Sequence, residues 1–363
     1  MMNIYGIKRI DLEKYFLCNG EKKFKALQVF EWLYDKRVSS FSEMSNIKKE
    51  LQEQLEKDFS MKMISIVKKQ EDKLTKKYLF KLFDGNFVEA VLMQHDYGLS
   101  ICVSSQVGCA FCESGRLKKV RDLGAYEIVQ QIMLVEEDIK KRISSVVIMG
   151  IGEPLDNYDN VMNFIKIIND PKGIAIGARH ITLSTCGLVP RIKDLMEENL
   201  QINLALSLHA PNTQLRDKIM PINKAYKLPI LMDTIKEYIE KTNRRVTIEY
   251  VMLKDVNDNE TQAIELSSLL KGLNVYVNLI PYNETNHIEF KKIDIYHWLE
   301  HYEDDMYEDW VDDLYGDIIN LPETKAFLEA INNCSKSRCS YWEKDKIEID
   351  ITPQRKDDFD FYD

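Results

Sequence analysis

The spacing of apolar residues divides the chain into a helical beginning and a longer region of alternating strands and helices. Apolar side chains recur three or four positions apart within residues 24–33 and again within residues 47–55. This period is typical of amphipathic helices. A polar turn near residues 39–45 separates the two stretches. We therefore predict a small helical module over residues 21–58.

From about residue 65 the pattern changes to short apolar runs of the kind that form strands. Three such runs read KYLFKLF, NFVEAVLM and SICVSSQ, and an Asp-Gly-Asn turn separates the first two. Farther along, strand-like runs alternate with helical stretches up to about residue 283. The further strands read SSVVIMG, HITLST, INLALSL, RVTIEYVML and VYVNLIP, and the helices cover residues 159–169, 190–199, 228–241 and 260–271. This order predicts an α/β fold with a parallel sheet of about six strands, open or barrel-like.

Small, polar and acidic residues directly follow the expected strands. They are Gly152, Glu153, Ser184, Ser207, Leu208, His209 and Asn283. In a parallel βα barrel, the loops after the strands gather around one mouth. Each residue alone is a weak signal, because a glycine after a strand is usually only a turn and a single histidine is more often structural. Together they predict a cofactor site, where Gly152 permits close approach of the backbone and Glu153 accepts hydrogen bonds from an amine or hydroxyl.

Cys109 and Cys112 stand in a CxxC spacing directly after the expected strand at residues 99–104, which places them at the same edge of the sheet. Spacing alone leaves three readings open. One is a redox pair of the thioredoxin type. Another is a zinc site, whose remaining ligands would have to come from a pair such as Cys334 and Cys339. The third is an iron–sulfur cluster with one iron left open for a cofactor.

The charge distribution changes what the net charge of −10 implies about partners. Residues 301–363 carry 18 acidic and 7 basic side chains, whereas the rest of the chain carries 41 acidic and 42 basic ones. Residues 62–81 contain seven lysines and two acidic residues, and four basic residues lie within 116–121. Such clusters can neutralise nucleic-acid phosphates, although solvated surfaces explain each cluster equally well.

Length and cysteine usage indicate the class of protein and its compartment. A chain of 363 residues predicts one large domain with a smaller accessory domain. It contains no apolar run of about 18 residues, and its start lacks the regions of a signal peptide. Its seven cysteines are odd in number and scattered, which favours thiols, metal ligands or catalysis over disulfides. We therefore expect a soluble cytoplasmic protein without a membrane partner.

Seven motifs in one order resemble the radical S-adenosylmethionine (SAM) methyltransferases of ribosomal RNA adenine, the RlmN/Cfr type. They read CVSSQVGC, FCESG, MGIGEPLDNYDNV, ARHITLSTCG, ALSLHAPN, IMPINK and VNLIPYN. The stretch KKFKALQVFEWLY at residues 22–34 is similar to the family's N-terminal accessory domain. The resemblance covers about residues 1–290. It implies a partial parallel (β/α)6-type radical SAM barrel with an N-terminal helical accessory domain.

The same resemblance divides the chain into four segments. Residues 1–62 would form the helical accessory domain, which resembles an RNA-binding domain, and residues 63–98 the connecting strands. Residues 99–290 would form the radical SAM barrel. Residues 291–363 would form a divergent acidic C-terminal segment.

The resemblance also implies cofactors and residue roles. Three cysteines of a CxxxCxxC motif hold the family's [4Fe–4S] cluster, and Cys109 and Cys112 match two of them. Glu89 matches the general base that removes a proton from the adenine. Cys102 matches the cysteine that resolves a covalent protein–RNA adduct. The SAM contacts would fall on Gly152, Glu153, Ser184, Ser207, Leu208, His209 and Asn283.

The partners implied by the resemblance are RNA and an electron donor. The target would be an adenine in 23S rRNA, with tRNA as a second substrate. The presence of Glu89 favours C2 of the adenine over C8, because a proton must leave C2 by base catalysis. The electron donor would be a flavodoxin or ferredoxin, and the protein would be a monomer.

Two departures from the family's pattern leave an alternative open. SSQVGC runs directly into AFCESG, so the middle cysteine of the family's cluster motif has no counterpart. The family's C-terminal cysteine, which carries a methyl group, has none either, because Phe361, Tyr362 and Asp363 stand where Ala-Ala-Cys would fall. The alternative is a degenerate, inactive family member that binds RNA or SAM without turnover.

Overall fold

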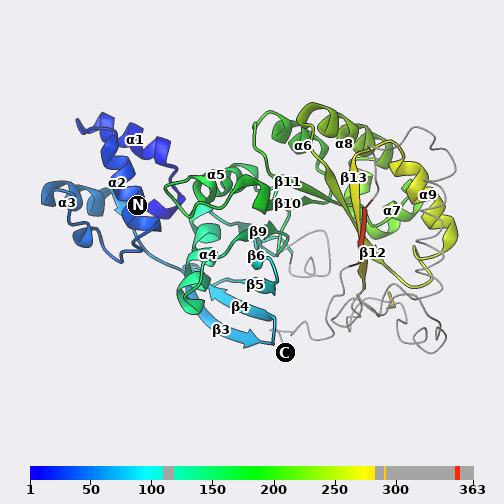
Figure 1. Ribbon diagram of the computed structural model, residues 1–363, viewed down its shortest axis with the longest axis horizontal. Coiled ribbons are helices and arrows are strands. Elements are labelled where there is room, and N and C mark those ends of the chain that lie inside the picture. Colours follow the sequence, from blue (N-terminus) through cyan, green and yellow to red (C-terminus); the bar gives the residue numbers. More distant parts are fainter. Residues whose placement is uncertain (109–117, 283–289, 292–347, 352–363) are drawn as a thin grey trace. The chain divides into compact units, whose positions relative to one another are not determined.

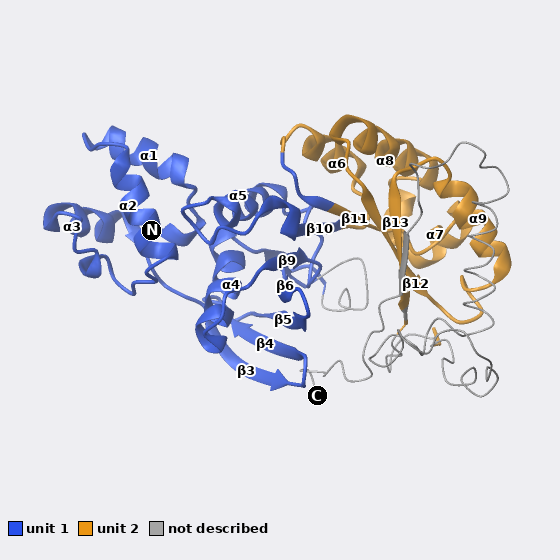
Figure 2. Cartoon of the chain, in the orientation of Figure 1, with its two compact units in different colours: residues 1–184, 200–203 blue, residues 185–199, 204–363 orange. Residues whose placement is uncertain are grey.

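The computed structural model of the chain describes residues 1–108, 118–282, 290–291 and 348–351 (Figure 1). Two compact units are distinguished in Figure 2, and each is described by itself. Unit 1 comprises residues 1–184 and 200–203, and unit 2 comprises residues 185–199 and 204–363. Cys109, Cys112 and Asn283 lie outside the described residues, as does nearly all of the acidic segment.

Unit 1 begins with the predicted helical module. Its elements are β1 (Met2–Asn3), η1 (Ile4–Gly6), α1 (Arg9–Cys18), α2 (Phe24–Tyr34), η2 (Phe41–Glu43), α3 (Lys49–Asp58) and β2 (Phe59–Ser60). The helices α2 and α3 confirm the prediction, whereas α1 was not predicted. The side chains that α2 buries recur at helical spacing from Ala26 to Leu33, so one face of the helix packs inward. The parallel pair β1–β2 brings the two ends of the module together.

The remainder of unit 1 contains a sheet with the strand order β10-β9-β6-β5-β4-β3. The strands are β3 (Ser65–Glu71), β4 (Thr75–Lys81), β5 (Phe87–His95), β6 (Gly98–Val103), β9 (Ser145–Ile148) and β10 (Ile181–Thr185). β3 to β6 pair antiparallel, and β6, β9 and β10 pair parallel. β3 was not predicted, because its sequence SIVKKQE lacks an apolar alternation. Lysines on such an edge strand discourage pairing with another sheet.

Two helices and several short elements complete unit 1. They are β7 (Gln106–Val107), β8 (Arg121–Asp122), α4 (Ala125–Ile139), α5 (Tyr158–Asn169) and η4 (Ala178–His180). α4 packs against both β6 and α5. α5 matches the prediction, whereas α4 was not predicted. Among the described residues, no helix is long and apolar enough to span a lipid bilayer.

Unit 2 continues the alternation of strands and helices. Its strands are β11 (Asn203–Ser207), whose first residue is counted with unit 1, β12 (Val246–Met252), β13 (Val275–Pro281) and β14 (Glu348–Ile351). These strands are parallel. Its helical elements are α6 (Val189–Met196), α7 (Thr213–Ile219), η5 (Pro221–Lys224), α8 (Leu228–Thr242) and α9 (Glu260–Leu270). α6 ends before the predicted residue 199, which adopts a left-handed turn with φ 49°. The predicted α/β fold with parallel strands is confirmed in both units.

Candidate active site

One row of residues crosses the sheet of unit 1 and contains Cys102. From β4 to β10, the residues directly opposite one another are Lys77, Val91, Cys102, Val147 and Thr182. Side chains that are directly opposite in a sheet point to the same face. Glu89 lies two residues before Val91, and Ser184 lies two residues after Thr182, so both also belong to this face. The sheet thus brings Glu89, Cys102 and Ser184 onto one face.

This face differs from the opposite one in burial. Ile101 and Val103, which flank Cys102, point the other way and are fully buried. Cys102 itself is half-buried, as are Glu89 and Ser184. A half-buried polar face can admit a substrate and still exclude much of the water around that substrate. We therefore call the face that carries Glu89, Cys102 and Ser184 the reaction face.

Glu89 is held on the reaction face by contacts to its side chain and its backbone. Its Oε2 lies 3.1 Å from the Nζ of Lys77, and each of the two side chains is 17% exposed. The Oγ of Ser104 donates a hydrogen bond of 2.6 Å to the backbone carbonyl of Glu89. The carboxylate is therefore fixed in place but still accessible, which suits a general base.

Cys102 is a thiol and not a thiolate near neutral pH. Burial raises the pKa of Cys102 to about 11, and the backbone N–H of Met149 opposes this shift. A metal ligand or a nucleophile of this type has to be deprotonated. The structure therefore gives Cys102 the character of a proton-bearing thiol.

The loop that leads to the CxxC pair is bound to the loop that contains Gly152. The backbone N–H groups of Ser105 and Gln106 donate to the carbonyl of Ile151 over 2.9 and 3.1 Å. The side-chain Oε1 of Gln106 accepts a hydrogen bond of 2.9 Å from the backbone of Glu153. Gly152 has φ 108°, and a Cβ at this position would lie 2.6 Å from the Cβ of Gln106. Gly152 thus permits a close approach to Gln106, whereas the approach to a cofactor that the sequence predicts stays a prediction.

Glu153 is buried within its own turn. Its side-chain Oε1 accepts a hydrogen bond of 3.1 Å from the backbone N–H of Leu155. Only 4% of the residue is exposed. The carboxylate therefore shapes the turn in addition to the hydrogen-bonding role that the sequence predicts for it.

A short ladder forms the stem of the loop that carries Cys109 and Cys112. Gln106 and Val107 on β7 pair with Asp122 and Arg121 on β8. Val120 adds a backbone hydrogen bond of 2.8 Å to Val107. The two described ends of the CxxC loop are therefore held side by side.

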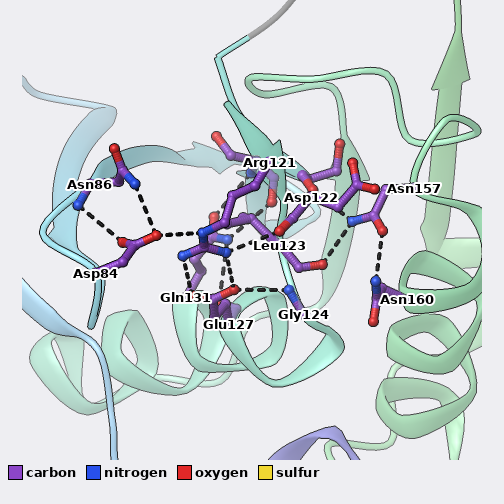
Figure 3. Close-up of polar contacts among 12 residues, drawn as sticks. Asp84, Asn86, Arg121, Asp122, Leu123, Gly124, Glu127, Gln131, Asn157 and Asn160 are labelled. Carbon is purple, nitrogen blue, oxygen red and sulfur yellow. Dashed lines mark hydrogen bonds and ion pairs between the residues drawn. The ribbon is translucent and has the colours of Figure 1, made fainter. Parts of the chain in front are cut away.

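Arg121 anchors this stem to the rest of unit 1 (Figure 3). Its guanidinium donates to both oxygens of the buried Glu127 over 2.8 and 2.9 Å, and it also contacts Asp84. The hydrogen bond from Arg121 holds the pKa of Asp84 well below its usual range. Glu127 Oε2 also accepts from the backbone N–H of Gly124 over 2.8 Å, which caps the start of α4.

Two buried amide side chains satisfy the backbone of the same region. Gln131 on α4 accepts from the N–H of Ser104 and donates to its carbonyl, both over 3.0 Å. Asn157 donates to the carbonyls of Ser105 and Leu123 over 2.8 Å. Sequence reasoning missed both residues. The signal for Gln131 was a pair of glutamines within the otherwise apolar run IVQQIMLV, because buried amides in such a helix need backbone partners. Asn157 lies within the motif MGIGEPLDNYDNV, but no role was assigned to it.

In unit 2, the Ser207-Leu208-His209 turn is fixed by neighbouring strands and loops. The backbone N–H groups of Leu208 and His209 donate to the carbonyl of Glu249 over 3.0 and 3.3 Å. The Nδ1 of His209 accepts a hydrogen bond of 3.1 Å from the N–H of Val251. The proton of the neutral ring is therefore on Nε2, which makes this atom a hydrogen-bond donor.

A buried arginine lies behind this turn. The side chain of Arg216 is fully buried, and its Nη2 donates to the carbonyls of Cys186 and Ser207 over 2.8 and 3.2 Å. Burial lowers the pKa of Arg216 to about 10, so the group keeps its charge near neutral pH. Arg216 thus ties the end of β11 to the segment that follows β10. No sequence motif pointed to it, because its role depends on carbonyls far away in the chain.

His209 predicts an acid-dependent stability. Burial, with the charge of Arg216 as a second cause, lowers the pKa of His209 from 6.5 to about 3. Between pH 6.5 and about pH 3, the unfolded chain binds a proton that the folded chain does not bind, so the free energy of unfolding falls as the pH falls. In His209→Asn, the Oδ1 replaces Nδ1 as acceptor, and asparagine tolerates the left-handed φ of 57°. Between about pH 7.5 and pH 5, this variant should lose about 2 kcal/mol less stability than the wild type.

Urea unfolding at the two pH values measures this difference. Equal losses in the wild type and in His209→Asn would show that His209 is not the titrating group.

The predicted site residues thus fall into three groups: those in unit 1, those in unit 2 and those outside the described residues. Unit 1 holds Glu89, Cys102, Gly152, Glu153 and Ser184. Unit 2 holds the Ser207-Leu208-His209 turn. Among the residues that the structure describes, no three His, Cys, Asp or Glu side chains are grouped as metal ligands.

Comparisons with known proteins agree with the motifs and the fold. Residues 2–61 match the family described as "Ribosomal RNA large subunit methyltransferase N-terminal domain", and residues 101–266 match the radical SAM superfamily. The "Probable dual-specificity RNA methyltransferase RlmN" of Enterococcus faecalis is 57% identical over 77% of this chain and 82% of its own. The protein of the same name from Listeria monocytogenes is 53% identical over 80% of this chain and 83% of its own.

A solved structure extends the agreement to three dimensions. A radical SAM methyltransferase from Sphaerobacter thermophilus has a TM-score of 0.81 and 30% identity to this chain. The match covers 98% of this chain and 96% of the other. Together with the relatives above, it confirms the resemblance predicted from the seven motifs. The chain therefore belongs to the RlmN family of radical SAM RNA methyltransferases.

Proposed function

We propose that this chain methylates C2 of an adenine in 23S rRNA and in tRNA on the reaction face of unit 1. The main support is the register that aligns Glu89, Cys102 and Ser184 on that face. The words "dual-specificity" in the names of the relatives support two RNA substrates. Enzymes that modify a base need it unstacked, and folded RNA provides such bases in loops.

Glu89 and Cys102 have separate roles in this proposal. The carboxylate of Glu89 removes the proton from C2 of the adenine, so its position beside the substrate decides the rate. We propose Cys102 as the resolving thiol that the family resemblance implies. The adduct itself would need a methyl-carrying cysteine, and the sequence has no counterpart for it at the family's position.

The cofactors of the family are SAM and a [4Fe–4S] cluster. When bound, they supply the methyl group and the radical that starts the reaction. We propose that Gly152, Glu153 and Ser184 of unit 1 contact SAM, together with the Ser207-Leu208-His209 turn and Asn283. The turn fits a polar nucleoside, because Ser207 and His209 are half-buried and His209 offers a fixed N–H donor.

The donor set for the cluster is smaller than the family's. We propose Cys109 and Cys112 as ligands, and family membership favours iron–sulfur ligation over the redox-pair and zinc readings of the motif. The middle ligand of the family's motif has no counterpart in the sequence. We do not propose Cys102 as its replacement, because the family resemblance assigns Cys102 to the resolution of the adduct.

We propose that a flavodoxin or ferredoxin supplies electrons, that the protein acts as a monomer and that it works in the cytoplasm. The four segments with boundaries at residues 62, 98 and 290 likewise stay a prediction.

Anaerobic reconstitution with iron and sulfide, followed by a methylation assay, tests the proposed function. A 23S rRNA fragment and a tRNA serve as substrates, and mass spectrometry of the digested nucleosides identifies the position of the new methyl group. We expect 2-methyladenosine in both RNAs. Methylation at C8 would overturn the assignment of the position, and RNA binding without methylation would favour the degenerate, inactive family member.

The ligand assignment predicts the effect of one cysteine. Cys112→Ala should abolish iron uptake in the same reconstitution, because a single thiolate remains in the motif. Iron content and electron paramagnetic resonance with and without SAM measure the result. Cys18→Ala is the matched control, since Cys18 is an exposed cysteine on α1. Unchanged iron in Cys112→Ala would show that the site has been placed wrongly.

A further inference from the structure

Lys77 stands at the β4 end of the row that crosses the reaction face. It is directly opposite Val91, and the next residue on the same face of β4, Leu79, is directly opposite Glu89. Lys77 and Glu89 are therefore diagonal neighbours on adjacent strands. Diagonal neighbours are within reach of long side chains. The distance of 3.1 Å between Nζ and Oε2 shows that the two charges meet.

The burial of Lys77 is unusual for a lysine on this face. Lysines generally keep the ammonium group in water, because removing its hydration is costly. Lys81, two positions beyond Leu79 on the same face of β4, is exposed, and its side chain makes no hydrogen bond or ion pair with the described residues. Lys77 is only 17% exposed and contacts Glu89. Position on this strand therefore does not by itself bury a lysine.

An ammonium group beside a general base has two physical effects. It favours the ionised form of the carboxylate, which is the form that accepts a proton. It also restrains the orientation of the carboxylate, because an ion pair of 3.1 Å favours the side-chain positions that keep Oε2 close to Nζ. Both effects gain importance when RNA covers the face, since RNA brings negative phosphates and displaces water.

We propose that Lys77 is a positioning residue that keeps Glu89 ionised and oriented for proton removal from the substrate adenine. This inference rests on the proposed function of Glu89. In the step concerned, C2 already carries the new carbon substituent, so the C2–H bond breaks and its electron pair restores the aromatic purine ring. The proton goes to a carboxylate oxygen of Glu89, and Lys77 keeps its own protons throughout.

The inference distinguishes Lys77 from a lysine that only binds phosphate. A phosphate-binding lysine mainly changes the affinity for RNA, and its effect is independent of Glu89. A positioning lysine changes the rate with RNA already bound, and its effect disappears when Glu89 cannot act as a base. A double-mutant cycle separates the two cases.

The experiment compares five variants of the full chain after reconstitution: Lys77→Met, Lys77→Arg, Glu89→Gln, the double variant Lys77→Met/Glu89→Gln, and Lys81→Met. Methylation is followed with saturating RNA, and RNA affinity is measured separately by fluorescence anisotropy. Lys77→Met should slow methylation about 10- to 100-fold while RNA affinity changes less than about threefold. Lys77→Arg should regain most of the lost rate, and Lys81→Met should keep the wild-type rate. The double variant should be no slower than Glu89→Gln.

Each other outcome has a defined meaning. A Lys77→Met rate equal to the wild type, with Glu89→Gln inactive, would overturn the inference but leave the proposed function intact. If the rate loss of the double variant equals the product of the losses in Lys77→Met and Glu89→Gln, Lys77 has a role independent of Glu89. That result would also overturn the inference. Full activity of Glu89→Gln, or no methylation by the wild type, would overturn the proposed function and the inference with it. If Lys77→Met does not fold, Lys77→Gln replaces it, because the glutamine amide keeps an uncharged polar group at this position.

Discussion

Replacement of Gly152 by alanine should separate the two loops of the candidate active site in unit 1 and abolish SAM binding. Gly152 has φ 108°, a backbone conformation that side chains rarely adopt. The added Cβ would lie 2.6 Å from the Cβ of Gln106 and 2.9 Å from its backbone nitrogen. Gln106 also accepts a hydrogen bond from the backbone of Glu153 and pairs with Asp122 in the stem of the CxxC loop. A shift of Gln106 would therefore move both Glu153 and the stem.

The expected loss is about 3–5 kcal/mol of stability in unit 1, since strain and steric overlap add. Urea unfolding measures the stability, and equilibrium dialysis with labelled SAM measures the binding. Gly85→Ala is the matched control, because Gly85 has φ 87° but a Cβ there would meet no atom within 4 Å. This control isolates the conformational strain from the overlap. Similar losses in both variants would show that contact with Gln106 is unimportant.

Glu89→Gln should lower the methylation rate about 100- to 10,000-fold, which is the usual contribution of a general base. Glutamine has nearly the same shape and can still accept a hydrogen bond from Lys77, so the fold and RNA affinity should be unchanged. The amide cannot accept the C2 proton. A single-turnover assay with methyl-labelled SAM and bound RNA measures the rate.

Glu71→Gln provides the control for this second variant. Glu71 is an exposed glutamate on the edge strand β3, where it pairs with Lys69 and Lys76. Its replacement removes the same charge from the same sheet but should leave the rate within about twofold of the wild type, because exposed pairs contribute little. A Glu89→Gln enzyme as fast as Glu71→Gln would remove Glu89 from the chemistry.

The sequence predicted the strands of the reaction face well, because their apolar residues alternate or form short runs. NFVEAVLM became β5 and SICVSSQ became β6 up to Val103. By contrast, β3 was not predicted, since an edge strand that is mostly exposed has little apolar signal. α4 was missed for the opposite reason. It is buried around much of its circumference, and its buried residues include Glu127, Gln130 and Gln131, which interrupt the apolar spacing.

The candidate site was predicted where motifs carry it and missed where long-range contacts build it. Glu89, Cys102 and Gly152 were predicted from stretches that resemble a family, and their roles stay a prediction. Lys77 was counted only as one lysine in a basic cluster, because its pairing with Glu89 depends on the register of β4 against β5. Arg216 and Gln131 bind backbone carbonyls of distant segments, and carbonyls leave no trace in a sequence. Residue types alone could not reveal these contacts.

The path of the chain through the two units has a consequence for the order of folding during synthesis. The chain leaves unit 1 after residue 184, contributes residues 185–199 to unit 2, and returns to unit 1 for residues 200–203. The returning segment is attached through Asn203, whose side-chain Nδ2 donates a hydrogen bond of 2.8 Å to the backbone carbonyl of Arg179. A nascent chain that ends before residue 203 therefore lacks part of unit 1, so neither unit can be completed as one uninterrupted stretch during translation.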